Sequence, residues 1–387
     1  MGTMPVSQPA RALASRMEGW PKLYMTKTIT VQASRLHDLY VAMGRSLGAS
    51  TDEATIFAQC YVRADLRGRF TAGAAVVPYI VSLIQQGLMN FGTELTIVRD
   101  EPAFAVIDGG DGVGSVVCTR AMQLAVDKAK LSGVGCVWVR RGGDFGMAAN
   151  HSLQAAEEGQ VGIAMRNGSP RVAPWGGREP FFGTCPISVA IPAGDERPIV
   201  IDMSAGSMSV GQTIFRARDG ARAGDNAFVS DDGRYTSNAS EVVIDPLDRE
   251  SALRGAIASL GHRGYGWLLM VELFAGLLAG MGSSNKNDFQ PTKERPWREG
   301  SFLMAVNIER LLPPEEFAQS VDELIRALRA VAPADGFEAV RVPGELADAC
   351  EERYLRQGIP IRAEVWTDLC HAAEALGVSI EPTDDVV

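Results

Sequence analysis

The stretch GIAMRNGSPRVAPWGGREPFFGTCPISVAIP, residues 162–192, decides the fold because it joins two short apolar runs through a turn-rich segment. The runs GIAMR and ISVAIP at its two ends have the length and composition of β-strands. Five prolines and a dense set of glycines stand within it. Such residues set the backbone and let a ligand approach it closely. The stretch therefore predicts a ligand site held next to two strands.

Further short apolar runs on both sides of this stretch predict a sheet. Glycine and proline turns separate them, and one helical run lies between them at 119–132. The pattern indicates an α/β fold with a sheet domain over residues 101–260. Residues 216–240 are polar and rich in glycine, which predicts a long surface loop. The further runs are AFAVID (103–108), GCVWVR (135–140), IVIDM (199–203) and, later in the chain, FLMAVN (302–307).

Helical periodicity dominates the chain before and after the sheet. Ser50 and Glu53 form the capping box of a helix that Gly68 ends. We predict a helical domain built from residues 25–100 and 261–387. Residues 1–24 before it are expected to be a disordered extension, and the alternative is that translation starts at Met25. The remaining helices are expected at 33–47, 76–86, 265–281, 314–330, 345–357 and 363–376.

Composition and charge exclude several classes of function. The 387 residues carry a net charge of −10 and no basic stripe, which argues against nucleic acid as a partner. Six cysteines without a CxxC pair and only four histidines leave little for a metal site, and scattered cysteines fit the reducing cytoplasm. The most apolar run, residues 267–281, contains Glu272 and is shorter than the roughly 20 residues that span a bilayer. We therefore expect a cytoplasmic protein with no membrane segment.

Two glycine-rich motifs precede helical runs and need separate interpretations. DGGDGVGS (108–115) is similar to a Rossmann phosphate loop, but Ser115 replaces the third glycine and the next strand ends in two arginines rather than an acid. We interpret it as the glycine-rich start of a helix. GHRGYG (261–266) places His262 and Arg263 at the start of a buried helix. Helix N–H groups and Arg263 together could form an anion site, and a hydrogen-bonded pair at the helix start is the equal alternative.

Several segments together resemble the malate/L-lactate dehydrogenase type-2 family, which includes ureidoglycolate and sulfolactate dehydrogenases and reductases of cyclic imino acids. They are residues 162–192 and 261–280, ADLRG (64–68), IDMS (201–204), VPGE (342–345) and RQGIPI (356–361). The resemblance implies a non-Rossmann NAD(P)-binding fold, in which a mainly antiparallel sheet flanked by helices binds the cofactor. It also implies a small-molecule substrate and a homodimer with the active site near the interface. It does not choose between NAD and NADP.

The resemblance also implies which residues contact the cofactor. Asn167 falls in the strand-end segment near the nicotinamide. For each position the alternative is a role in a turn or in packing. The other implied contacts are Asp202, Met203 and Ser204, then His262 and Arg263, and finally Pro343, Gly344 and Glu345.

The chain departs from the family at the positions that carry its chemistry. Thr71 and Ala72 stand where the family has Ser-His, and Val76 stands where an arginine would bind the substrate carboxylate. Asp144 stands in place of the second active-site histidine. Histidine titrates near neutral pH, whereas an aspartate is ordinarily ionised there unless burial retunes it. The candidate catalytic positions are therefore Thr71, Ala72 and Asp144, with both histidines lost.

Three hypotheses follow from these losses. The first is an NAD(P)-dependent oxidoreductase with an altered substrate, such as a cationic imine whose charge Asp144 would stabilise. The second is a scaffold reused for non-redox chemistry, with Asp144 as a base. The third is a non-catalytic binding protein. The chain matches the family's cofactor-binding motifs better than its substrate-binding motifs, which favours the first hypothesis.

Overall fold

The computed structural model describes residues 27–245, 253–286, 292 and 299–380. The extension that the sequence predicts at residues 1–24 lies outside these residues. Within the described chain, no helix is both long enough and apolar enough to cross a membrane.

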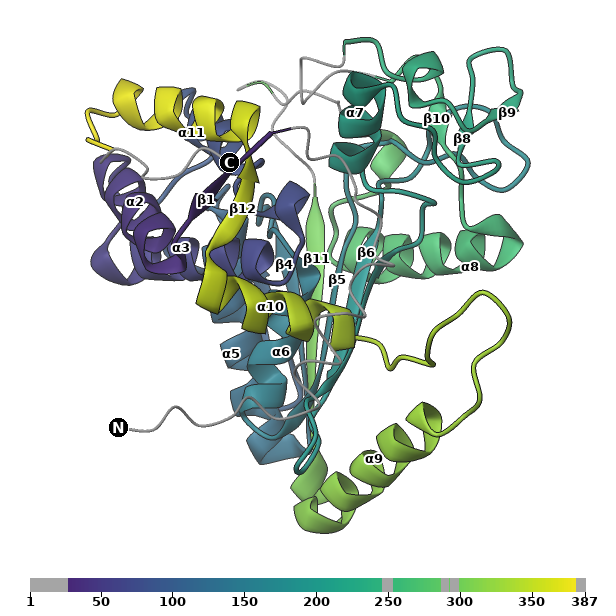
Figure 1. Ribbon diagram of the computed structural model, residues 1–387. Coiled ribbons are helices and arrows are strands. Elements are labelled where there is room, and N and C mark those ends of the chain that lie inside the picture. Colours follow the sequence, from purple (N-terminus) through teal and green to yellow (C-terminus); the bar gives the residue numbers. More distant parts are fainter. Residues whose placement is uncertain (1–26, 246–252, 287–291, 293–298, 381–387) are drawn as a thin grey trace, which may run out of the picture.

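A seven-stranded sheet occupies the centre of the described chain (Figure 1). Only β3 and β4 run parallel, joined by helix α5 (Gly114–Ser132), and every other neighbouring pair of strands in this sheet is antiparallel. This confirms the predicted α/β fold with a mainly antiparallel sheet. In spatial order the strands are β2 (Thr96–Glu101), β3 (Phe104–Asp108), β4 (Val134–Arg140), β11 (Gly300–Asn307), β5 (Gln160–Arg166), β6 (Pro186–Ile191) and β7 (Ile199–Ser204).

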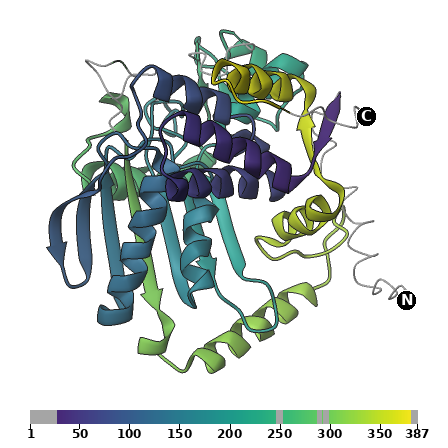
Figure 2. The same cartoon turned by 90° about the vertical axis from the view of Figure 1, so that its left-hand side faces the viewer.

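Alternating side chains of the sheet build two separate cores. On one face, Val137, Val139 and Leu303 pack under α5, and α6 (Ala148–Glu157) lies beside it (Figure 2). On the other face, Trp138 and Phe302 belong to a core shared with α8 (Gly261–Val271) and the π-helical turn η4 (Glu272–Leu277). Successive residues of a strand point to opposite faces, so one strand serves both cores.

The two ends of the described chain meet in a helical unit with its own core. Strand β1 (Thr28–Val31) pairs antiparallel with β12 (Ile359–Arg362). This pairing brings the N- and C-terminal parts of the described chain together. The helices of its core are α2 (Ala33–Ser46), α3 (Thr51–Leu66), α4 (Val77–Gln85) and α11 (Ala363–Ala375), while α9 (Pro314–Arg329) and α10 (Glu345–Gln357) lie beside the sheet.

Two sequence-based boundaries differ from the structure. The predicted domain division places residues 261–387 in the helical domain. In the structure, β11 lies between β4 and β5 at the centre of the sheet and pairs with both. Both partner strands lie far earlier in the chain. Residues 216–240 are not a continuous surface loop. They contain the end of α7 (Val210–Asp219) and two short strands, β8 (Phe228–Val229) and β9 (Tyr235–Thr236), and Phe228 is fully buried.

The glycine-rich segment 108–115 does start a helix, and α5 begins at Gly114. A side chain at Gly114 would bring its first carbon within 2.2 Å of the backbone oxygen of Asp144. Glycine is required there because two loops touch through their backbones. This close approach positions the loop that carries Asp144.

Candidate functional site

A cavity of about 470 Å³ opens where several segments of the chain converge. The predicted catalytic residues Thr71, Ala72 and Asp144 all line it. The predicted cofactor residues Asn167, Asp202, Met203 and Ser204 also line it. The fold thus brings the two groups of predicted site residues into one space.

The segment that carries Thr71 and Ala72 is held by a buried carboxyl. Residues Phe70–Ala72 form a short 3-10 turn, and Asp65 of α3 accepts a hydrogen bond of 2.8 Å from Ala74 N–H beyond it. A side chain at Gly73 would lie 2.1 Å from Asp65 Oδ1. Complete burial raises the pKa of Asp65 well above its usual range, opposed by the Ala74 hydrogen bond. The buried Asp65 therefore fixes the position of the backbone around Ala72 in the cavity wall.

Asp144 lies in the loop between β4 and α6 and is already ion-paired. Its Oδ1 accepts a hydrogen bond of 2.7 Å from Gly146 N–H, and its Oδ2 lies 3.2 Å from Nη2 of Arg166. One quarter of the Asp144 side chain remains exposed to the cavity side. Asp144 is therefore one member of an ion pair and not an isolated carboxylate.

Arg166 connects Asp144 to a second carboxylate that the sequence analysis missed. Its Nη1 donates to Glu299 Oε2 at 2.5 Å, and its guanidinium lies 5.3 Å from the centre of the Phe145 ring. Glu299 directly precedes β11, whose Ser301 pairs with Arg166 of β5, so strand pairing brings the two side chains together. We call Asp144, Arg166 and Glu299 the ion cluster. All three line the cavity.

The charges of the ion cluster act on the pKa values of Arg166 and Glu299. Burial acts to lower the pKa of Arg166, but the carboxylates of Asp144 and Glu299 outweigh it and raise that pKa. Burial raises the pKa of Glu299, opposed by Arg166 and by the hydrogen bond from Ser169 N–H. Two carboxylates share one guanidinium, so the cluster carries one net negative charge when all three groups are ionised.

The segment Asp202–Ser204 forms the wall at the end of β7. Arg69 donates to the backbone oxygen of Asp202 at 3.1 Å, and its Nε lies 3.5 Å from Asp202 Oδ2. Ser204 Oγ donates to the backbone oxygen of Thr184 at 2.7 Å. Met203 is 39% exposed and offers an apolar surface. This wall therefore combines an apolar face with a paired acid.

Asn167 has the kind of packing role that the sequence analysis gave as the alternative to a cofactor contact. Its side chain is fully buried, and its Oδ1 accepts a hydrogen bond of 2.9 Å from Gly300 N–H. Its Nδ2 lies 3.5 Å from Glu272 Oε1 and from the backbone oxygen of Gly282. The amide therefore ties β5 to β11 and to η4, and the residue is placed to position the cavity wall rather than to reach a ligand with its side chain.

A second cavity of about 270 Å³ adjoins the first and shares Arg69, Met147 and Asp202 with it. The predicted cofactor residues Pro343 and Gly344 line this second cavity. Gly344 has a φ of 104°, and a side chain there would come within 3.1 Å of Val200 N, so the loop lies directly against β7.

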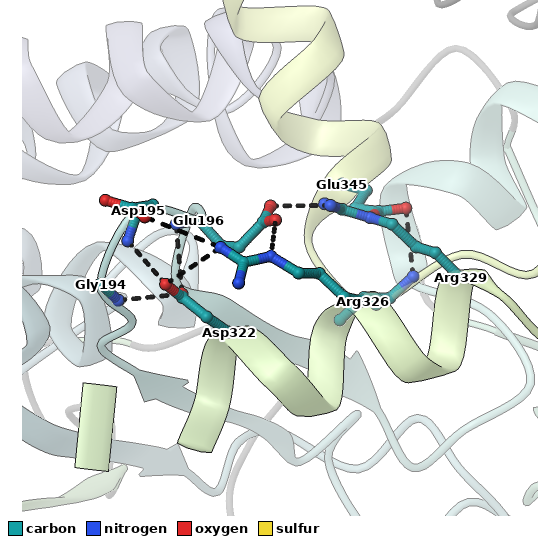
Figure 3. A network of polar contacts seen from close by, with 8 residues as sticks. Gly194, Asp195, Glu196, Asp322, Arg326, Arg329 and Glu345 are labelled. Atoms are coloured by element: carbon teal, nitrogen blue, oxygen red, sulfur yellow. Dashed lines mark hydrogen bonds and ion pairs between the residues drawn. The ribbon is translucent and has the colours of Figure 1, made fainter. Parts of the chain in front are cut away.

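Glu345 positions this loop and lines neither cavity. Its carboxylate accepts hydrogen bonds from Val342 N–H at 3.1 Å and from Arg329 Nε at 2.5 Å. Arg329 also pairs with Glu196 at 2.7 Å, which joins α9 to the turn between β6 and β7 (Figure 3). The network shown in Figure 3 holds the start of α10 against the sheet.

His262 and Arg263 lie apart from both cavities. They are exposed at the start of α8, and the ring of His262 lies 6.4 Å from that of Trp175. Leu260, just before the helix, does line the first cavity. Within one copy of the described chain, neither residue therefore contacts a ligand bound in the first cavity.

The structure adds four polar groups that the sequence analysis did not single out. They are Arg166, Glu299, Arg69 and Tyr79, all of which line the first cavity. No histidine lines this cavity among the described residues. In the same part of the chain, no group of three or more His, Cys, Asp or Glu side chains could hold a metal ion.

Comparison with known proteins gives a consistent result. The model of the malate/L-lactate dehydrogenase family matches residues 31–370. Malate dehydrogenase of Pyrococcus horikoshii is 34% identical over 354 residues, covering 90% of this chain and 96% of that protein. The structure of sulfolactate dehydrogenase from Methanocaldococcus jannaschii superposes with a TM-score of 0.83 at 30% identity, covering 92% of this chain and 100% of the other. That of delta1-piperideine-2-carboxylate reductase from Pseudomonas syringae has a TM-score of 0.77 at 28% identity, covering 89% and 99%.

Proposed function

Because the chain belongs to the malate/L-lactate dehydrogenase family, we propose that it is an NAD(P)-dependent oxidoreductase whose substrate is neither lactate nor malate. The observation that carries this proposal is the shared cavity, which joins Asp202–Ser204 to Ala72 and Asp144. The substrate would be a 2-oxo or 2-hydroxy acid with an unusual side chain, or an imino compound. We place the protein in the cytoplasm, because all six cysteines are free thiols and reducing conditions preserve them.

The residues of the two cavities fit a dinucleotide. The first cavity offers Met203 as an apolar surface and the start of α6, at Met147 and Ala148, as a source of N–H groups. The second offers arginines and the start of α10. A bound nicotinamide cofactor would supply or accept the hydride. The side chains of this protein would bind and orient it and would hold the proton that accompanies the hydride.

The ion cluster favours a substrate that carries positive charge. Its net negative charge lies at the cavity wall, and Val76 leaves the family's carboxylate-binding position apolar. A protonated imine needs no acid at its nitrogen, whereas a ketone needs a proton donor at its oxygen. By its name, the similar reductase from Pseudomonas syringae acts on a cyclic imine that also carries a carboxylate. We therefore place a cationic imino compound ahead of a 2-oxo acid.

A second candidate function keeps the fold without redox chemistry. It is favoured by the replacement of both family histidines by Ala72 and Asp144. In that case Asp144 would act as a base, or the protein would bind a small molecule without turnover. Cofactor binding separates this candidate from the first.

The purified protein is expected to bind at least one reduced nicotinamide cofactor. Burial of the ring against Met203 would change its fluorescence, so titration with NADH and with NADPH measures the affinity directly. A Met203→Asp variant would place a charge on the apolar surface and should weaken binding about tenfold or more. If neither cofactor binds the wild-type protein, the oxidoreductase proposal is wrong.

We also propose a homodimer formed through the exposed face of α8 and η4. Several large apolar side chains are exposed along these two helical segments, and exposed apolar patches mark interaction sites. The face continues from Leu260 at the wall of the first cavity, so a second copy bound there would lie beside the active site. Its exposed apolar residues are Trp267, Leu269, Leu273, Phe274, Leu277 and Leu278.

A Leu277→Glu variant is expected to run as a monomer of 41.4 kDa, while the wild type has twice that mass. A buried unpaired carboxylate at an interface costs enough to separate most dimers. Light scattering after size-exclusion chromatography measures both masses. Leu324→Glu, at a similarly exposed leucine of α9, is the matched control and should stay dimeric. A monomeric wild type would disprove the dimer.

A further inference from the structure

The second cavity has the features of an anion site. Three arginines line it, Arg67, Arg69 and Arg341, and Asp202 is the only carboxylate among its described lining residues. The first turn of α10, at Leu346 and Ala347, also faces it. Free N–H groups and the helix dipole at such a start favour a negative group.

Arg67 provides an independent observation that points to a ligand. It is 4% exposed, and its Nη1 donates to Asp348 at 2.7 Å and to Glu351 at 2.8 Å. Its Nη2 is buried without a hydrogen-bond partner in the described chain. A buried guanidinium N–H left unpaired is costly unless a ligand or water completes it. The cavity that Arg67 lines is where such a partner can bind.

We propose that the second cavity is a phosphate subsite, and that the phosphate it takes is the 2′-phosphate on the adenosine ribose of NADP(H). This assignment rests on the proposed function, since it names the cofactor of that site. The catalytic positions Ala72 and Asp144 line the first cavity, so the reacting end of the cofactor belongs there and the adenosine end belongs in the second. A phosphate monoester carries more charge than either phosphorus of a pyrophosphate, and arginines bind it through paired hydrogen bonds.

Asp202 supports a phosphate rather than a free ribose hydroxyl. In enzymes that prefer NAD, an acid accepts hydrogen bonds from the 2′-hydroxyl. Here Arg69 engages both the carboxylate and the backbone oxygen of Asp202. Burial raises the pKa of Asp202, opposed by Arg69 and Arg67. The wall between the two cavities is therefore less negative than a free aspartate would make it.

The test compares binding of NADPH and NADH by nicotinamide fluorescence in the wild type and in Arg341→Gln. We expect the wild type to bind NADPH about tenfold more tightly than NADH, and the variant to lose about tenfold for NADPH and little for NADH. The control Arg356→Gln removes the same charge from the exposed last turn of α10, roughly 16 Å along the helix axis from its start. It should change the binding of neither cofactor. Equal losses for both cofactors would overturn the 2′-phosphate assignment in favour of the pyrophosphate.

A second arm uses adenosine 2′,5′-bisphosphate, adenosine 5′-monophosphate and inorganic phosphate in thermal-shift measurements. The bisphosphate should raise the melting temperature of the wild type more than the monophosphate does, and the effect should shrink in Arg341→Gln and in Arg67→Lys. If the bisphosphate stabilises the protein while neither nicotinamide cofactor binds, the subsite stands and the oxidoreductase proposal fails. If all three ligands act equally on wild type and variants, the subsite is wrong.

Discussion

Replacing Arg166 by methionine is expected to lower the free energy of unfolding by about 3–5 kcal/mol. The methionine fills much of the same volume but leaves two carboxylates at the cavity wall without their shared cation. Glu299 suffers most, because its side chain is only 5% exposed. Loss of the contact with the Phe145 ring adds a smaller cost. Urea unfolding of both proteins at pH 7 measures the difference.

The pH dependence of this loss has a definite sign. Burial already raises the pKa of Glu299 above 4.5, and Arg166 opposes the rise. Without the arginine, the folded state binds a proton at Glu299 more tightly than the unfolded state does. Protonation then relieves the unpaired charge, so the destabilisation is largest at neutral pH and shrinks as the pH falls toward the ordinary range of glutamate.

Two further variants control for packing and for charge. Arg178→Met removes an arginine from an exposed pair with Glu179 and should change stability by no more than about 0.5 kcal/mol. Adding Asp144→Asn and Glu299→Gln to Arg166→Met removes the unpaired charges and should recover most of the lost stability. A loss that stays the same at every pH, or that these additions deepen, would show that the ion cluster does not work as described.

Much of the fold could be predicted from local patterns. Helices α2, α3, α9 and α11 repeat apolar residues at helical spacing, and the capping box at Ser50 appears in the structure as predicted. The place of β11 in the sheet could not be predicted, because its partners stand more than a hundred residues earlier and a single apolar run carries no sign of its neighbours. The two-residue strands within 216–240 could not be predicted, because two residues are too few to show an apolar alternation in a polar, glycine-rich segment.

The candidate site was predictable only where a motif marks it. Ala72, Asp144 and Asp202 stand in recognisable segments, and the fold brings them to one cavity. Arg166 and Glu299 stand 133 residues apart, and only the pairing of β5 with β11 places them together. Asn167 shows the opposite difficulty. Its motif suggests a ligand contact, but in the structure its side-chain amide has three hydrogen-bond partners. No local sequence pattern indicates these partners.

An Asp144→Asn variant is expected to lower kcat/KM by about 10²–10⁴-fold while NADPH binds nearly as well as to the wild type. Asparagine keeps the hydrogen bond from Gly146 N–H but removes the charge that faces the cavity. Assays of 2-oxo acids and cyclic imines with both reduced cofactors measure the rate, and fluorescence titration measures binding. Unchanged turnover on a substrate that the wild type reduces would remove Asp144 from the mechanism.

Restoring the two histidines by Ala72→His and Asp144→His should not by itself produce reduction of simple 2-oxo acids. Arg166 lies 3.2 Å from the present carboxylate, and a cation at that distance would hold an introduced imidazole in its neutral form. A neutral imidazole is a much weaker proton donor to a ketone oxygen than an imidazolium is. Adding Arg166→Ser should therefore raise the rate above that of the double variant, because Glu299 would then favour the protonated imidazole. If the double variant already reduces 2-oxo acids, Arg166 does not control the proton chemistry of this site.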